Sequence, residues 1–168
     1  MSSWTILLTS GVVAAIVGGG VNLLLARWKA RYEERDRVRT VFAEAYAVYT
    51  QYRESPFMIR RREAGNLAAE RLRIGESIRL VQERLSYFQA WTTIESPTVG
   101  RAYAALVAQM RATSGAAMQE AWRNPGITED IEMNTPPDAP ALADLSALES
   151  AYTKAASEHL KRLNPRFG

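Results

Sequence analysis

Apolar residues recur along most of this 168-residue chain with the spacing of amphipathic helices. Steps of three and four place them on one face of a helix that turns once every 3.6 residues. The clearest series are Val38, Phe42, Ala45, Tyr49 and Tyr52; Ile74, Ile78, Val81, Leu85, Phe88 and Trp91; Val99, Tyr103, Leu106, Met110, Ala117 and Ala121; and Leu145, Leu148, Tyr152, Ala155 and His159. No stretch alternates as a strand would, so the pattern predicts an all-α protein.

Turn signals divide the helical part into four segments. Ser55-Pro56 is a stop, because the residue before a proline disfavours helical backbone angles. Ser96-Pro97 is a start, with a capping serine and a proline in the first turn. Mostly short connections then predict an antiparallel, coiled-coil-like four-helix bundle. We expect a bundle over 27–163, helices over 27–54, 60–94, 97–122 and 140–163, a loop over 123–139 and a C-terminal tail over 164–168.

The N-terminal segment has a different pattern. Residues 4–26 carry no charge, and a helix of that length spans about 34 Å, against about 30 Å for a bilayer core. Basic residues follow this segment and none precedes it, which is the reverse of a cleaved signal peptide. The positive-inside rule places residues 1–3 outside and the bundle in the cytoplasm. The sequence therefore predicts a signal-anchor: a transmembrane helix that continues into the bundle of a single-pass protein of the cell membrane.

Two groups of residues accompany the predicted span. Small residues four apart allow two membrane helices to approach closely, although such residues are also common in membrane helices that stay alone. This packing stripe consists of Ser10, Gly11, Ala14, Ala15, Gly18, Gly19 and Asn22. Basic and aromatic residues directly after the span predict contact with the lipid of the inner leaflet. They are Arg27, Trp28, Lys29 and Arg31.

The chain has few residues and motifs that could support catalysis or metal binding. The sequence has no cysteine and one histidine, His159, which excludes thiolate chemistry and sites built on histidine pairs. It contains no phosphate-binding loop, nucleophile elbow or zinc-binding histidine pair. We therefore expect no catalytic, metal or cofactor site and no enzyme. The excess of arginine over lysine is typical of a bacterial genome rich in GC.

The most concentrated charge in the part of the chain predicted to be soluble is the triplet Arg60, Arg61 and Arg62. It falls at the same predicted end of the bundle as three loop acids, Glu129, Asp130 and Glu132. These residues are candidates for contact with a partner protein, or for a solvated turn with internal pairing. A single triplet does not predict binding of nucleic acid, which needs a longer basic stripe.

Aromatic residues offer one further candidate site. Tyr46, Tyr49 and Tyr52 could line a ligand pocket with Phe42, but their three-residue spacing favours a bundle core. His159 lies on an apolar helix face without a second histidine, which favours a core or boundary position over catalysis.

These features predict a non-enzymatic, membrane-anchored interaction or scaffold module. Its expected partners are the lipid bilayer, a second copy of the chain and an unidentified cytoplasmic protein. The alternative hypothesis is a small effector that oligomerises to perturb the membrane, such as a toxin, a holin-like protein or a phage-defence protein. A third hypothesis is a bundle that senses a small molecule through its tyrosines.

Overall fold

The computed structural model describes residues 3–128 and 144–163, and within the first helix it describes side chains from Asn22 onward. These residues form helices and one isolated parallel β-bridge between Glu63 and Ile127. The all-α prediction is confirmed. The helices are α1 (Ser3–Arg53), α2 (Ser55–Arg60), α3 (Leu67–Glu95), α4 (Pro97–Arg123) and α5 (Ser146–Arg162).

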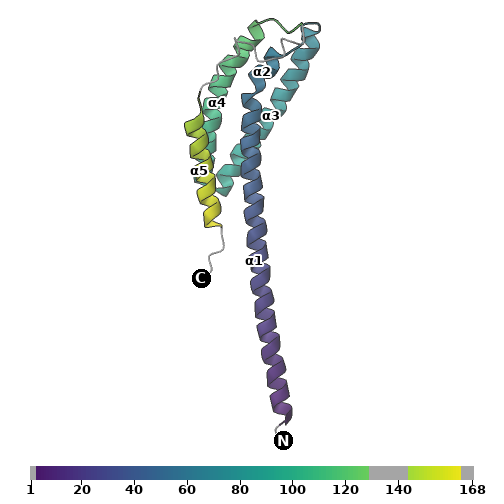
Figure 1. Cartoon of the computed structure of the whole chain (residues 1–168), viewed down its shortest axis with the longest axis vertical. Coiled ribbons are helices and arrows are strands. Elements are labelled where there is room, and N and C mark those ends of the chain that lie inside the picture. The colour runs from purple at the N-terminus through teal and green to yellow at the C-terminus, as the bar shows by residue number, and fades with distance from the viewer. Residues whose placement is uncertain (1–2, 129–143, 164–168) are drawn as a thin grey trace.

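The long helices run in alternating directions (Figure 1). α1 rises to α2 at one end of the molecule, α3 returns, α4 rises again and α5 returns beside α4. α1 and α4 are the central elements, because each of them contacts all four other helices. The first part of α1 extends well beyond the bundle, so only its second half takes part in the packing (Figure 1).

The predicted apolar faces form the core. All five members of the first series, Val38 to Tyr52, are at most 4% exposed, and all six members of the α4 series are buried. The α3 series is buried at Ile74, Leu85 and Phe88 and half-buried at its other positions. Helical periodicity therefore identified the inward faces correctly.

Local capping explains where two helices begin. The Ser96 hydroxyl accepts a hydrogen bond from the Val99 amide at 3.5 Å, and Pro97 occupies the first turn of α4, as predicted. The predicted helix over 60–94 was wrong in its first part. Residues 55–60 form the separate helix α2, and α3 begins only after Asn66, whose side chain accepts from the Ala69 amide at 3.3 Å. The asparagine cap sets the start of α3, and the apolar series from Ile74 onward did not define that start.

The last helix also begins later than predicted. Residues 144–145 are not helical, and Asp144 Oδ1 accepts a hydrogen bond from the Ser146 amide at 2.9 Å at the start of α5. This local bond competes with an earlier helical turn. Most of the predicted loop over 123–139 and the predicted tail over 164–168 lie outside the described residues.

The predicted membrane localisation is contradicted. Among the residues that the structure describes, no helix is both long enough and apolar enough to cross a bilayer. In the described part of α1, the apolar run at Leu23–Leu25 is followed at once by Arg27 and then by further charges. This finding overturns the single-pass protein with its N-terminus outside, and it removes the support for the membrane-perturbing effector.

Glycines in α3 and α4 have opposite surroundings. Gly100 lies at a close crossing of the two helices, where an added Cβ would stand 2.5 Å from Thr93 Cα. Gly75 and Gly115 lie in helical backbone where an added Cβ would meet nothing within 4 Å. Glycine is therefore required by packing at the first position and not at the other two.

We predict that Gly75→Ala and Gly115→Ala each raise the free energy of unfolding by about 0.5–1 kcal/mol, because alanine loses less backbone entropy in a helix. Gly100→Ala should lower it by about 1–3 kcal/mol through overpacking. Urea denaturation of the three variants measures both effects. Destabilisation at Gly75 or Gly115 would contradict the open surroundings described here.

Candidate interaction surface

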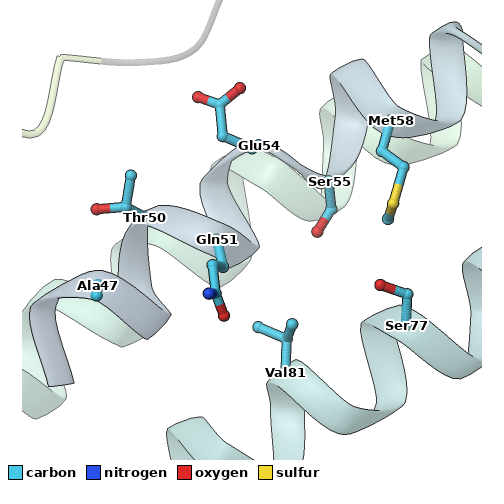
Figure 2. Close-up of a pocket in the computed structure, with 8 residues that line it drawn as sticks. All are labelled: Ala47, Thr50, Gln51, Glu54, Ser55, Met58, Ser77 and Val81. Carbon is cyan, nitrogen blue, oxygen red and sulfur yellow. The ribbon is translucent and has the colours of Figure 1, made fainter. Parts of the chain in front are cut away.

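A groove runs between the end of α1, the short helix α2 and the middle of α3. It has a volume of about 680 Å³. Figure 2 shows Gln51 and Ser55 facing Val81 and Ser77 across it, while Glu54 points away. The full lining is Ala47, Thr50, Gln51, Glu54, Ser55, Met58, Ser77 and Val81. Mostly small side chains line the groove, which is why the helices leave it open.

A second hollow, of about 670 Å³, adjoins the groove at Ala47. We call it the α1 shelf, and its lining is Asp36, Arg39, Thr40, Ala43, Glu44 and Ala47. All six residues are exposed. At 100° per residue, they lie on the side of α1 away from Ala45 and the core series. α1 thus has a buried face of large side chains and an exposed face with small ones.

Large apolar side chains stand on α3 beside these hollows. Leu80, Tyr87 and Ile94 recur every seven residues and are 48%, 60% and 85% exposed. We call this row the α3 ridge. Leu80 and Tyr87 also line a third hollow that shares Ser77 and Val81 with the groove. The groove, the shelf and the part of the ridge formed by Leu80 and Tyr87 therefore make up one continuous surface, the α1–α3 face.

The charges of the α1–α3 face differ between its two helices. The exposed acids Asp36 and Glu44 on α1, and Glu54 directly after it, form no ion pair with other described residues. On α3, Arg84 lies between Leu80 and Tyr87 and donates to Gln51 Oε1 at 3.2 Å. The α1 shelf therefore carries two acids together with the cation Arg39, and next to the ridge Arg84 donates to a neutral amide.

The structure separates the three arginines of the triplet. The Arg62 side chain is buried and donates to the main-chain carbonyls of Ile59 and Ala121 at 2.9 Å and of Asn124. Its guanidinium also lies 4.9 Å from the centre of the Trp122 ring. Because α4 ends at Arg123, Arg62 satisfies carbonyls that the helix itself leaves without partners.

The other two arginines lie nearer the surface. Arg60 is half-buried and donates to the carbonyl of Pro125 at 3.0 Å, whereas Arg61 is exposed. Burial, followed by repulsion from Arg60 and Arg71, lowers the pKa of Arg62. The acids that the sequence analysis grouped with the triplet, Glu129, Asp130 and Glu132, lie outside the described residues. No pattern in the sequence signals the role of Arg62, because its acceptors are main-chain carbonyls.

The tyrosines belong to the core rather than to a pocket. Phe42, Tyr49 and Tyr52 are buried, and Tyr46 is half-buried against Tyr152, with ring centres 6.2 Å apart. Tyr49 donates to Glu149 Oε1 at 2.6 Å, and Arg53 donates to the same oxygen at 3.0 Å. This network ties α5 to the end of α1.

Two tyrosines predicted only as members of apolar helix faces also form hydrogen bonds between helices. Tyr103 of α4 donates to the carbonyl of Ala45 at 2.9 Å, and Tyr152 of α5 donates to the carbonyl of Phe42 at 2.7 Å. Burial is the main cause that raises the pKa of both phenols. The neutral, hydrogen-bonded form is therefore the one that the folded chain favours.

His159 is a partnered boundary residue. Its Nε2 lies 2.9 Å from Glu95 Oε1, and its ring meets Phe42 edge-on. Glu95 also lies 3.9 Å from Arg37, which forms a two-bond contact with Glu34 at 2.6 and 2.9 Å. The chain of contacts joins α1, α3 and α5 at the end of the bundle opposite to α2.

The residues predicted to face a membrane lie on the projecting part of α1. Of the packing stripe, Asn22 is exposed, and the side chains of Ser10 to Gly19 lie outside the described part. Arg27, Lys29 and Arg31 are exposed, and Trp28 packs on Tyr32 with ring centres 6.0 Å apart. The predicted contact of these four residues with the inner leaflet depended on the predicted transmembrane span. Because that span is contradicted, the predicted lipid contact has no support.

Comparisons with known protein families, with curated proteins and with solved structures found no match for this chain. Within the described ranges, no group of three or more acidic or histidine side chains is placed to hold a metal ion. The surface features above are therefore the basis for the functional proposal.

We predict that Arg62→Met lowers the free energy of unfolding by about 2–3 kcal/mol, since charged hydrogen bonds to carbonyls at a helix end are lost. The neighbouring exposed Arg61→Met should change it by less than about 0.5 kcal/mol. Chemical denaturation of both variants measures the difference. Equal effects would show that Arg62 does not hold the end of α4.

Alkaline pH should destabilise the fold through its buried phenols. The pKa of a tyrosine in the unfolded chain is about 10, and below that pH the phenols are protonated in both states, so the free energy of unfolding is unaffected. Above that pH the unfolded chain loses the protons first, and the free energy of unfolding falls. We therefore predict a melting temperature that falls above about pH 10. The double variant Tyr103→Phe/Tyr152→Phe should have a shallower fall, and the exposed Tyr87→Phe should not. Identical slopes in all three proteins would refute this assignment.

Proposed function

We propose that the chain is a non-enzymatic interaction module that docks another protein on its α1–α3 face. The observation that carries the proposal is the α3 ridge, a row of exposed apolar side chains of which Leu80 and Tyr87 line a hollow that adjoins the groove. Rows spaced by seven residues and hollows between small residues are the two components of knobs-into-holes helix packing. The chemistry of the face therefore fits a helical protein surface.

The lining of the groove supports docking over acid–base chemistry. Its hydroxyl groups, on Thr50, Ser55 and Ser77, share the groove with no imidazole, and the one carboxylate, Glu54, points away from it (Figure 2). A nucleophilic hydroxyl needs an adjacent base for activation. The eight lining residues offer shape and apolar contact instead.

The structure gives less support to a small-molecule site at the tyrosines and to a main partner contact at the arginine triplet. Of the tyrosines that a small molecule could contact, Tyr46 and Tyr49 pack against each other, and Tyr49 donates to the carboxylate of Glu149. At the α2 end of the bundle, Arg61 is the exposed member of the triplet and remains a candidate for a secondary contact. We place the main docking surface on the α1–α3 face because it combines apolar area with shape.

Filling the hollows should abolish docking. In Ala47→Arg, a long side chain enters the point where groove and shelf meet, and we predict that proteins cross-linked to the chain in cells fall by about tenfold or more. Ala105→Arg, on an exposed position of α4, is the matched control. Quantitative mass spectrometry after cross-linking measures every associated protein, including other copies of the chain. Unchanged association in the Ala47 variant would refute the proposed face.

A further inference from the structure

We infer that residues 124–127, which follow α4, form a strap that holds the groove in its docking shape, and that release of this strap switches docking off. The inference rests on the proposed function, because it concerns the regulation of the same face. α2 supplies Ser55 and Met58 to the groove, opposite Ser77 and Val81 of α3 (Figure 2). The shape of the groove therefore depends on where α2 is held.

α2 is positioned by α4 rather than by the helices that border the groove. It packs much more on α4 than on α1 or α3. Its buried side chain Ile59 meets Ile74 and Ala121 in a small cluster that is distinct from the main core. An attachment through a distinct cluster can be lost while the main core stays packed, because proteins also open in local units.

α2 has little stability of its own. It has six residues, and a helix so short does not persist without tertiary contacts. Glu54 at its N-cap forms no side-chain cap bond, and Pro56 has no amide with which to continue the hydrogen bonds of α1. The joint between α1 and α2 is therefore a hinge position, and contacts with the end of α4 decide whether α2 stays in place.

The strap supplies contacts directly after α2. The amide of Ile127 donates to the carbonyl of Arg62 at 2.8 Å, and the amide of Ala64 donates to the carbonyl of Ile127 at 3.0 Å. The carbonyl of Pro125 accepts a hydrogen bond from the Arg60 side chain at 3.0 Å. Because these bonds join the strap to the end of α2 and to the turn that follows it, release of the strap frees α2 at its end.

Gly126 shows how closely the strap packs. An added Cβ would stand 2.9 Å from the Ala64 nitrogen and from the Arg62 carbonyl oxygen, and neither main-chain atom can give way without a shift of the turn. The φ of Gly126 is not positive, so its backbone angles do not require glycine. Gly126→Ala therefore loosens the strap by collision, at a position that does not line the groove.

Release of the strap and docking are then linked. A partner that binds only the held position of α2 loses apparent affinity as the fraction of chains with a released strap grows. By reciprocity, a docked partner keeps the strap in place. Pro125 is exposed and lies outside the groove lining, so the strap gives the groove a control point at a second place on the surface.

Thiol labelling of the full-length chain tests the strap, because the chain has no native cysteine. Ser55 is 2% exposed, so Ser55→Cys reports movement of α2, and Val99→Cys reports opening of the main core. We expect Gly126→Ala to speed labelling at position 55 by about tenfold and at position 99 by less than about twofold. Gly100→Ala, the matched substitution at the crossing of α3 and α4, should speed labelling at position 99 and not at position 55.

Amide hydrogen exchange provides a second measurement that needs no cysteine. In Gly126→Ala and in Arg62→Met, exchange over 55–64 should accelerate by about tenfold, while exchange over 38–52 stays slow. Equal acceleration of the two segments would show that the strap does not open separately from the core, and it would overturn the inference.

The link to docking is tested with the proteins cross-linked in cells. The double variant Arg62→Met/Gly126→Ala should make the released state the main one and lower their amount by about tenfold, with slow exchange over 38–52. Fast exchange over 38–52 in this variant would contradict a separate opening. If labelling accelerates at position 55 and association is unchanged in the double variant, the strap does not regulate docking, and the proposed function stands without it. If Ala47→Arg affects no association, the proposed function itself fails.

Discussion

Two buried phenol groups set the heights at which α4 and α5 pack on α1. Tyr103 and Tyr152 donate to carbonyls of Ala45 and Phe42, which are three residues apart on one face of α1. Apolar contacts tolerate sliding of one helix along another, whereas a buried hydroxyl has one position at which its hydrogen bond forms. These two hydrogen bonds fix the positions of α4 and α5 on α1, and they therefore also determine which side of α1 is left uncovered.

Because α4 and α5 are fixed on the core side of α1, the opposite face of α1 and the outer edge of α3 remain exposed together. The small side chains of the α1 shelf have little apolar surface to bury. Covering the shelf therefore removes much apolar area from water only if the covering surface carries larger side chains. The larger side chains of the α3 ridge are exposed in the same way. The candidate surface is thus a consequence of the packing order of the bundle.

The sequence was sufficient for features that depend on helical period and on local turn chemistry. The inward faces of α1 and α4 and the start of α4 at Ser96-Pro97 were predicted correctly, because those signals lie within a few neighbouring residues. The start of α3 was missed because one asparagine cap decided it. The membrane assignment relied on the hydropathy of 4–26, and no span was found among the described residues. Arg62 and the α1–α3 face could not be predicted, since both arise where distant segments meet.

The attachment of Arg62 has a consequence for the order of folding. Its acceptors on α4 are about sixty residues further along the chain, and Ile127 bonds to the main chain of Arg62 and Ala64 from a similar distance. Contacts of such long sequence separation form late, after the loop between them has closed. The turn between α2 and α3 therefore acquires its native shape only when the end of α4 arrives, and the two should open and close as a single cooperative unit.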